Sequence, residues 1–279
     1  MVGETLEVKR QLDLCDLYPS SFPKEKKVSR FEDSESGGEA WQYKMRELFA
    51  KEESDMPYWE NYDLDIKKST VEEIPVSVAK RVIDKYEWLG CMPVGVKKCY
   101  GLYFPSKNDN TRILGGVTVF SKEYAENTGV WEKYGFNGEI ILLARGVNLH
   151  FCPKNANSHL IMESIKMLPE EYKVITCTVD PLAGEVGTIY QSCNFYYVGV
   201  MRRCKERIGC IIGDKLYGSR ALRQKFGTQK KEVILEKCPE ARFIKQKSKG
   251  RYFYFRGDKR IKRDNLKKIS HMIKPYPKR

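Results

Sequence analysis

The chain of 279 residues has few of the side chains that hold metal ions or form a disulfide framework. It contains three histidines and nine cysteines, an odd number without any Cys-x-x-Cys pair. Structural zinc sites take Cys and His ligands at short spacings, so the sequence predicts no metal site. Without a secretory signal, reduced thiols are expected rather than disulfide bonds.

Long apolar runs are also missing. No uninterrupted stretch approaches the ~20 apolar residues with which a helix spans a bilayer. The first residues, Met-Val-Gly-Glu-Thr-Leu-Glu, lack the basic and then apolar order of a secretory signal. We therefore expect a cytoplasmic protein that has no membrane partner.

Acidic residues are scarce in one part of the chain only. Residues 1–70 hold 16 acidic and 11 basic residues, and residues 71–200 hold 14 and 13. Residues 201–279 hold 7 acidic and 26 basic residues, a net charge of +19 within a total of +13. A basic segment beside a nearly neutral core is typical of a surface that binds nucleic acid. The alternative is a solvated basic tail that only aids solubility.

Apolar periodicity predicts three parts: a partly flexible arm over residues 1–60, a core over residues 61–203, and a basic nucleic-acid-binding extension over residues 204–279. In the core it predicts strands over residues 62–68, 98–104, 112–120, 139–147, 172–179 and 195–201. Helices are predicted over residues 75–90, 156–168 and 185–192. This order indicates an α+β protein with a mixed central sheet flanked by helices.

In the extension, residues 242–256 are predicted to form a hairpin. Its second strand, Arg251-Tyr-Phe-Tyr-Phe-Arg256, places four aromatic residues between two arginines. This pattern suits a platform on which bases stack while cations meet phosphates. The alternative is an edge strand with its tyrosines on one face and its phenylalanines buried on the other. The residues assigned to nucleic-acid binding are Lys247, Lys249, Arg251, Tyr252, Tyr254 and Arg256.

The most informative stretch runs from Cys177 to Gly199. A β-branched run ends at Asp180, and a Pro/Gly turn then leads into a short amphipathic helix with Tyr190 near its end. This order places an acid and base pair beside the carboxyl end of a strand, where open sheets bind their ligands. The competing interpretation is a buried strand, a turn and a core tyrosine.

The segment Ile189-Tyr-Gln-Ser-Cys-Asn-Phe195 resembles the tyrosine signature of GNAT-fold acyltransferases, with Asn194 where glycine is usual. Asn tolerates a left-handed backbone, so the turn can be kept. In those enzymes the tyrosine that matches Tyr190 often protonates the leaving thiolate of coenzyme A. Their glycine-rich pyrophosphate loop at a helix start has no counterpart in residues 145–158, which argues against acetyl-CoA as the cofactor.

From about Ala79 to Gly199, and more loosely to Phe255, the chain is similar to the Mom DNA-modification proteins of Mu-like phages, which have a GNAT-like fold. The pieces that carry this resemblance are Gly90, Arg145, Pro153-Lys-Asn-Ala-Asn-Ser-His-Leu-Ile161, Asp180, Gly187-Thr-Ile-Tyr-Gln-Ser-Cys-Asn194 and Tyr197-Val-Gly199.

The resemblance implies a transferase that adds a carbamoylmethyl group to the exocyclic amine of adenine in phage DNA and thereby blocks restriction. It implies that Asp180, Tyr190, Arg145 and Ser158 serve the active site. The family's His-Tyr pair, proposed to help hold iron, corresponds here to Glu87-Trp88. Iron is therefore implied by the resemblance alone, and the donor of the group stays open.

The amine of adenine is a poor nucleophile because its lone pair is delocalised into the ring. A transferase must hold it against an electrophile, remove a proton and stabilise the leaving group. We expect Asp180 to accept the proton and Tyr190 to donate to the leaving group or to contact the base. Arg145 is expected to meet an anion or to pair with Asp180. Ser158 is expected to bind a donor phosphate or carboxylate, or only to cap its helix.

Four further residues are expected at the substrate. Gln191 and Asn194 can pair with the Watson–Crick edge of an extruded adenine, and Trp88 and Glu87 lie at the position of the family's His-Tyr pair. The expected partners are double-stranded DNA and a small-molecule or carrier donor. Two alternatives are an acyl-CoA-dependent N-acyltransferase for a small amine, an aminoacyl-tRNA or a modified pyrimidine, and a non-catalytic nucleic-acid-binding protein.

Overall fold

A computed structural model describes residues 40–52, 58–123, 131–136, 138–200, 207–213, 215–246 and 248–278. Residues 1–39 of the arm that was expected to be partly flexible lie outside the described residues. The described part of the arm begins with the helix α2 (Trp41–Glu52) and the short helix η1 (Tyr58–Asn61). No helix in the described ranges is long and apolar enough to cross a membrane.

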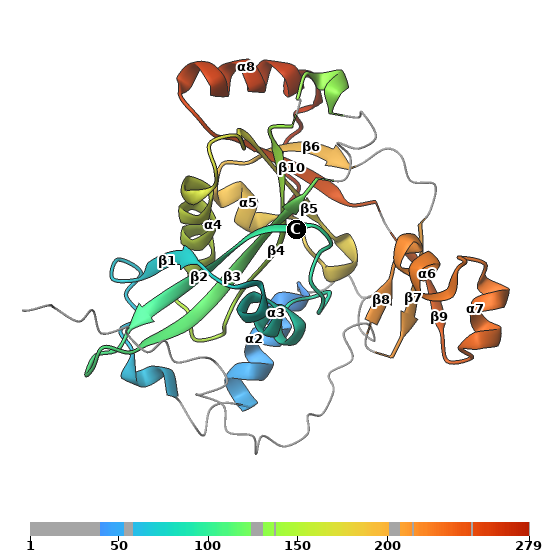
Figure 1. The fold of residues 1–279 in the computed structure, drawn as a ribbon, viewed down its shortest axis with the longest axis horizontal. Coiled ribbons are helices and arrows are strands. Elements are labelled where there is room, and N and C mark those ends of the chain that lie inside the picture. Colours follow the sequence, from blue (N-terminus) through green and yellow to red (C-terminus); the bar gives the residue numbers. More distant parts are fainter. Residues whose placement is uncertain are drawn as a thin grey trace, which may run out of the picture.

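A seven-stranded sheet forms the centre of the molecule (Figure 1), with the strand order β1-β2-β3-β4-β5-β10-β6. Only β4 and β5 run parallel, and every other neighbouring pair is antiparallel. The sequence-based prediction of an α+β protein with a mixed sheet is confirmed. The strands are β1 (Thr70–Glu73), β2 (Val96–Pro105), β3 (Arg112–Lys122), β4 (Ile140–Asn148), β5 (Val174–Val179), β6 (Tyr196–Val200) and β10 (Gly250–Phe255).

The first strand lies later in the chain than the sequence predicts. Tyr62 makes only an isolated bridge to Ser106 and residues 66–68 form a turn, because the carboxylates of Asp63 and Asp65 accept hydrogen bonds from the backbone N–H groups of Asp65 and Lys67. Asp side chains that bond to nearby backbone in this way compete with strand pairing. The strand β1 begins only at Thr70, where this competition ends.

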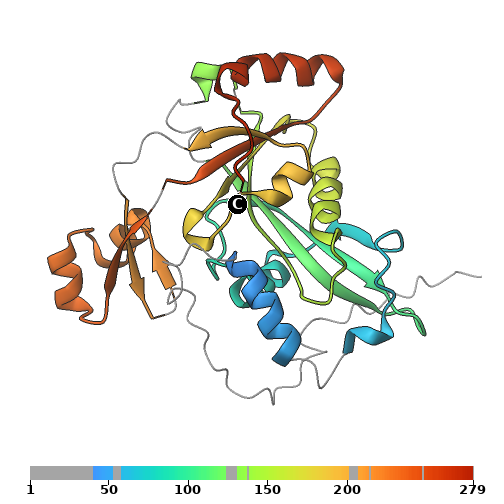
Figure 2. The same cartoon turned by 180° about the vertical axis from the view of Figure 1, so that it is seen from behind.

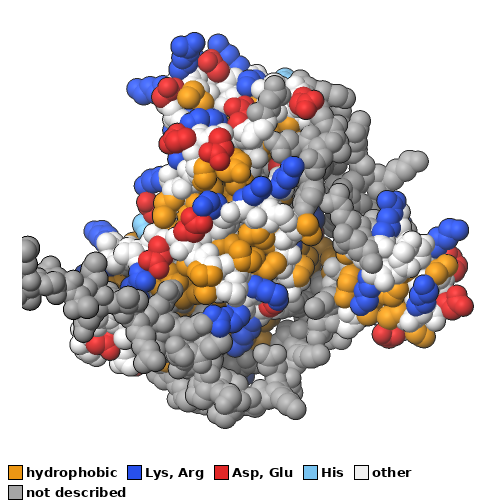
Figure 3. All heavy atoms as spheres, in the orientation of Figure 1, with side chains coloured by type: hydrophobic (Ala, Val, Ile, Leu, Met, Phe, Trp, Pro, Cys, Tyr) orange, Lys and Arg blue, Asp and Glu red, His pale blue; other side chains and the backbone are white. Residues whose placement is uncertain are grey.

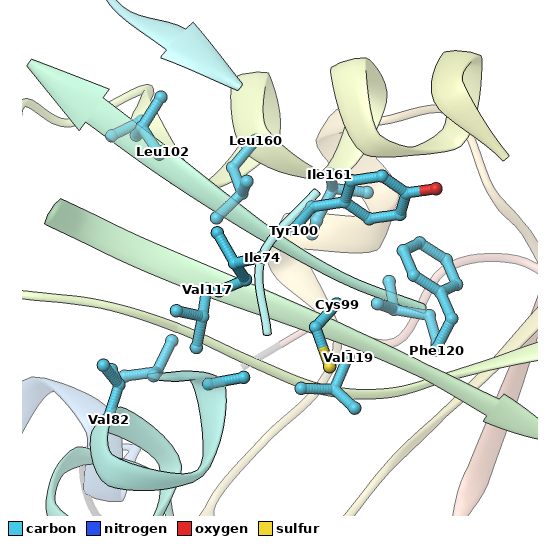
Figure 4. Packing of buried hydrophobic residues seen from close by; sticks show 14 of the residues in the cluster. Ile74, Val82, Cys99, Tyr100, Leu102, Val117, Val119, Phe120, Leu160 and Ile161 are labelled. Atoms are coloured by element: carbon cyan, nitrogen blue, oxygen red, sulfur yellow. The ribbon is translucent and has the colours of Figure 1, made fainter. Parts of the chain in front are cut away.

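Helices cover both faces of the sheet. The helix α3 (Val76–Tyr86) lies on one face and α4 (Ala156–Met167) on the other. Figure 4 shows Cys99 and Val117 of β2 and β3 on the side of α3, whereas Tyr100 and Phe120 lie on the side of α4. Since side chains alternate along a strand, the continuous apolar runs of β2 and β3 supply both halves of the core, and all four of these side chains are buried.

A second, smaller sheet is built between β6 and β10 and has the order β8-β7-β9. It lies beside the main sheet in both views (Figures 1 and 2). Its elements are β7 (Arg207–Ile212), β8 (Lys215–Tyr217), β9 (Arg242–Gln246) and the helices α6 (Ser219–Phe226) and α7 (Lys231–Lys237).

The predicted hairpin over residues 242–256 is wrong. Its first strand, β9, pairs with β7 in the small sheet, whereas its second, β10, enters the main sheet between β5 and β6. The difference has a physical cause, because Tyr252, Phe253 and Phe255 are bulky residues on both faces of one strand. Such a strand is best accommodated in the interior of a sheet that is covered on both sides. All three side chains are buried there.

The parallel strands β4 and β5 part at their carboxyl ends. Their pairing runs from Ile140 and Val174 to Leu143 and Cys177 and goes no further. A register shift in β4 places one extra residue, Ala144, opposite β3, and β4 then continues to Asn148 beside β3 alone. Bulges of this kind bend a strand and re-aim its side chains. The two strand ends therefore open a gap between the residues after Leu143 and those after Cys177.

The chain ends by crossing back over the sheet. The helix α8 (Lys259–Ile269) and the turn η5 (Ser270–Met272) follow β10. The tail then runs along β6 towards α5 (Thr188–Ser192), where the backbone N–H of Lys274 donates to the carbonyl of Tyr197 and the hydroxyl of Tyr276 to that of Phe195.

Candidate functional site

Asp180 lies directly after β5 and begins the short helix η4 (Pro181–Ala183). Its Oδ1 accepts a hydrogen bond from the backbone N–H of Leu182 at 3.1 Å, and its Oδ2 lies 2.8 Å from Nζ of Lys249. Only 7% of Asp180 is exposed. Lys249 arrives there because β10 pairs with β5, with Gly250 opposite Val179. A lysine that the sequence assigned to nucleic-acid binding thus neutralises the predicted proton acceptor.

Glu185 is a second carboxylate in the same turn, and the sequence had not led us to expect it at the site. Its Oε2 accepts a hydrogen bond from the backbone N–H of Asp180 at 3.2 Å. Burial, together with the charges of Glu87 and Asp180, raises the pKa of Glu185 to about 7, although the Asp180 hydrogen bond and Lys249 oppose this. Near neutral pH this side chain therefore exchanges between its acid and its carboxylate form.

Arg145 meets Glu87 rather than Asp180. Its Nε lies 3.7 Å from Oε2 of Glu87 and donates to the carbonyl of Cys91 at 2.9 Å. The predicted helix over residues 75–90 ends at Tyr86, because the Glu87 carboxylate accepts the N–H groups of the next turn and turns the chain over the end of β4. The Arg145–Asp180 ion pair considered from the sequence does not form.

Tyr190 lies in α5, next to the carboxyl end of β5. Its hydroxyl lies near the thiol of Cys177, and its ring packs 5.5 Å from that of Phe195. Burial raises its pKa well above 10, and the neighbouring Cys177, Glu185 and Glu87 add to this effect. The hydroxyl therefore stays protonated at neutral pH and is a hydrogen-bond donor.

The turn after α5 has the conformation that the sequence predicts. Asn194 has a φ of 59°, in the left-handed region, and it replaces glycine there without changing the turn. Gln191 has its amide nitrogen within hydrogen-bond distance of the Val186 carbonyl, the Tyr252 hydroxyl and the Pro277 carbonyl. This side chain joins α5 to β10 and to the C-terminal tail, a role that the sequence did not indicate.

Ser158 and Trp88 lie in the surroundings of this turn, and each is held by local structure. The hydroxyl of Ser158 donates to the Asn155 carbonyl at the start of α4, at 3.0 Å. The indole of Trp88 is only 4% exposed and packs with Ala183 of η4 and Ile211 of the small sheet. Trp88 therefore presents no exposed ring face for a base, and it links the site to the small sheet.

The strand β10 does not offer the exposed stacking platform that its sequence suggested. Tyr252 is fully buried beneath α5, where its hydroxyl donates to the Val186 carbonyl, and a side chain at Gly187 would collide with its ring. Arg251 is buried against Glu123, with NH1 2.8 Å from Oε2. Tyr254 packs on Phe195. The edge-strand alternative is also wrong, because β10 has a neighbour on each side.

Of the remaining two residues of that set, Arg256 lies apart from the site. Arg256 donates to the carbonyls of Pro169 and Lys166 at the end of α4 and is thereby tied to the protein's own backbone. Lys247 lies outside the described residues.

The described residues do not fit the iron site that the family resemblance implies. Nowhere in the described ranges do three or more His, Cys, Asp or Glu side chains gather as metal ligands. Glu87, which takes the place of the family's histidine, is already held by Arg145 and by two backbone N–H groups. The groups that can act chemically at this site are its carboxylates, its cations and Tyr190.

The turn between β4 and α4 is packed with aromatic rings. Phe151 stacks on Trp59 of η1 at 5.7 Å, and His150 meets the same indole edge-on at 4.7 Å. Arg46 of α2 donates to the carbonyls of His150 and Cys152. These contacts hold the turn between β4 and α4 against α2 and η1.

The parted ends of β4 and β5 thus bring together three carboxylates, two cations and one tyrosine. Arg145 and Asp180 stand at the two strand ends, and Tyr190 adjoins the second. The sequence predicted these three residues but missed Glu185. The available signal was its position as the one charged residue in the turn between Asp180 and Tyr190. Lys249 could not be placed because its position depends on the pairing of β10 with a strand about 70 residues earlier.

Comparison with known proteins adds an independent finding. The model of the Mom protein family matches residues 68–278 of this chain. A search among proteins with curated descriptions finds no match. The matched range contains the whole site, from Glu87 to Lys249, and the resemblance noted in the sequence is confirmed.

Proposed function

The chain belongs to the Mom protein family, which is associated with phage DNA modification, and from this premise we propose that it is a transferase for the exocyclic amine of adenine in DNA. The transferred group is small and carbamoylmethyl-like. The modification protects phage DNA from restriction in the cytoplasm of the bacterial host. Duplex DNA and an activated small-molecule or carrier donor are the two substrates.

One observation carries this proposal. A protonated tyrosine, two partly buried cations and a carboxylate whose pKa is raised to about 7 converge where β4 and β5 part. Transfer to a weakly nucleophilic amine needs a proton acceptor, a donor for the leaving group and fixed positive charge for an anionic donor. Tyr190 and Arg145 supply the last two, and Ser158 and Asn194 remain candidates for contacts with the donor and the base.

The fold supports a GNAT-like interpretation of this site. The parallel strands part beside a tyrosine helix, and the turn after that helix keeps its left-handed residue. The aromatic packing around Phe151 argues against the acyl-CoA-dependent N-acyltransferase considered from the sequence, because it fills the expected pyrophosphate loop. Coenzyme A is therefore not our choice of donor.

The DNA backbone requires a basic surface, and the helix α8 provides one. Five of its basic residues are exposed, and its two acidic neighbours, Asp258 and Asp264, leave a clear excess of positive charge. Figure 3 shows the blue side chains of Lys and Arg gathered on α8 at the top of the view. Duplex DNA is the partner that this charge suits. The exposed basic residues of α8 are Lys259, Arg260, Lys262, Arg263 and Lys267.

Access to the amine requires the base to leave the duplex. An adenine inside the stack hides its exocyclic amine, so enzymes that act on bases extrude them at a cost of a few kcal/mol. Contacts with the phosphates stabilise the bound duplex and offset this cost.

The function is tested by mass spectrometry of nucleosides from bacteria that express the protein. We expect a new, heavier deoxyadenosine product with the wild type and a product at least about 100-fold scarcer with Arg145→Gln. Glu163→Gln, which removes only a surface ion pair with Lys166 on α4, is the matched control and should leave the product unchanged. An adenine pool that is identical with and without the protein would refute adenine modification.

The same experiment separates the alternatives. A modified pyrimidine, or an acylated small amine that depends on acyl-CoA, would favour the N-acyltransferase. DNA affinity that falls with salt, without any modified nucleoside, would favour the non-catalytic binding protein.

A further inference from the structure

We propose that Glu185, and not Asp180, is the side chain that takes the proton from the target amine. Asp180 then acts as a positioning residue that holds Glu185 and Lys249 in place. This inference rests on the proposed function and assigns the proton-transfer step within it. Three observations support it: the hydrogen bonds of the two carboxylates, their surroundings and the stoichiometry of the transfer.

The hydrogen bonds distinguish the two carboxylates. Both oxygens of Asp180 are engaged, Oδ1 by the N–H of Leu182 and Oδ2 by the ammonium of Lys249. Only Oε2 of Glu185 is engaged, by the backbone N–H of Asp180. Its Oε1 has no hydrogen-bond partner among the residues that the structure describes. Glu185 therefore has an acceptor atom ready for a substrate N–H, whereas Asp180 would first have to release a partner.

The charged and titratable groups around Glu185 come from every element packed on it. Glu87 follows α3, Asp180 ends β5, Tyr190 belongs to α5, and Lys249 precedes β10. Two carboxylates and burial favour the protonated form of Glu185, so its basicity exceeds that of an ordinary carboxylate. A base whose pKa lies near the working pH accepts protons efficiently and is still ionised in part of the molecules.

The bonds and protons of the transfer balance when the donor is an activated alkyl compound, in which the carbon to be transferred bears a leaving group. The amine nitrogen forms a bond to that carbon, and its N–H proton passes to Oε1 of Glu185. The bond from carbon to the leaving group breaks, and its electron pair departs with the leaving group. The Tyr190 hydroxyl donates a hydrogen bond to this group as charge develops. When the leaving group takes up the one proton released, Glu185 returns to its carboxylate form.

The test compares four variants with the wild type. Purified protein is given duplex DNA and a deproteinised small-molecule extract of the host cells as the donor source, and initial rates of nucleoside modification are measured from pH 5.5 to 9. We expect Glu185→Gln to lose at least about 100-fold in rate. Asp180→Asn should keep measurable activity. The rise of its rate with pH should occur at a lower pH than in the wild type, because a charge that raises the pKa of Glu185 is removed. Glu163→Gln should match the wild type.

The outcomes separate this inference from the proposed function. If the wild type modifies adenine and Glu185→Gln keeps its rate while Asp180→Asn loses it, Asp180 is the base and the inference is wrong. If both variants are inactive, Glu87→Gln decides. If Glu185 is the base, the rate of this variant rises with pH at a lower pH than that of the wild type. A rise at the same pH as in the wild type overturns the inference. No modified adenine with the wild type, in cells or in the extract, would instead sink the proposed function.

Discussion

Tyr190 is the residue at which sequence and structure agree most closely. Its hydroxyl lies near the Cys177 thiol, and its ring packs against those of Phe195 and Tyr252. Tyr190→Phe keeps the ring and removes only the donor. We expect the free energy of unfolding to fall by about 1 kcal/mol and the modified nucleoside to fall at least about 100-fold. Thermal unfolding and nucleoside mass spectrometry measure the two effects, and Tyr43→Phe, on the exposed side of α2, is the control. Unchanged modification would remove Tyr190 from the chemistry.

Glu185 links stability to pH. Its pKa rises from 4.5 to about 7 on folding, mainly through burial, so the folded protein binds this proton more tightly than the unfolded chain does. The resulting stabilisation is complete below about pH 4.5 and is lost as the pH rises through about 7. Glu185→Gln cannot ionise. We therefore expect it to raise the free energy of unfolding at pH 8 by on the order of 2–3 kcal/mol, with little change at pH 4.5.

Urea unfolding at the two pH values measures this difference, with Glu163→Gln as the control. If the free energy of unfolding rises equally at both pH values, the ionisation of Glu185 is not the cause, since a packing effect does not depend on protonation. A variant that is more stable and less active would fit the trade-off expected of a buried catalytic carboxylate.

Among the elements, β10 shows the strongest dependence on a single buried ion pair. Arg251 bonds to Glu123, which also accepts from Thr176, and its guanidinium lies over the ring of Trp131. Arg251→Ala removes this guanidinium from the buried Glu123 carboxylate, and we expect a loss of about 3–5 kcal/mol in the free energy of unfolding. Replacing both members, as Arg251→Met with Glu123→Leu, should recover most of it. Urea unfolding is the measurement, and a double variant as unstable as the single one would argue against this explanation.

The helix α8 permits a test of the DNA-binding surface. Replacing Lys259, Lys262 and Arg263 by Gln should weaken duplex binding and reduce the slope of log affinity against log salt by about 0.9 for each phosphate that the helix no longer neutralises. Fluorescence anisotropy over a range of NaCl concentrations measures both quantities. The same change at three basic residues of the β2–β3 hairpin, Lys97, Lys107 and Lys122, is the matched control. Equal slopes in the two triple variants would mean that α8 makes no specific contribution.

Local patterns predicted most elements correctly, and long-range pairing explains the errors. The apolar runs of β2 to β5 and the helix α4 could be read because their periodicity is determined within each segment. The strand β10 was assigned to the wrong sheet, since its aromatic run equally suits a hairpin or a central strand. The site shows the same limit, because Asp180 and Tyr190 lie in one short segment whereas Lys249 comes from a distant one.

At the scale of the whole molecule, the small sheet is an insertion between two strands, β6 and β10, that pair with each other in the main sheet. It leaves the main sheet after β6 and returns as β10, and on the way Ile211 packs with Trp88 and Ala183 beside the site. The module therefore contributes a wall of the site, besides basic charge. The small sheet packs on η4 and leads along the chain to Lys249. A distortion of the small sheet is therefore expected to shift Asp180, which begins η4 and pairs with Lys249.

The interior place of β10 also has a consequence for the order in which the protein forms during synthesis. The strands β5 and β6 leave the ribosome long before residue 250, and until then neither has its shared partner. Pairing between segments so far apart in sequence is slow to form, and unpaired strand edges are prone to aggregation in the meantime. The lysine that neutralises Asp180 arrives with the same strand. The candidate site is thus completed among the last steps of folding, and a chain released early carries an exposed sheet edge and no assembled site.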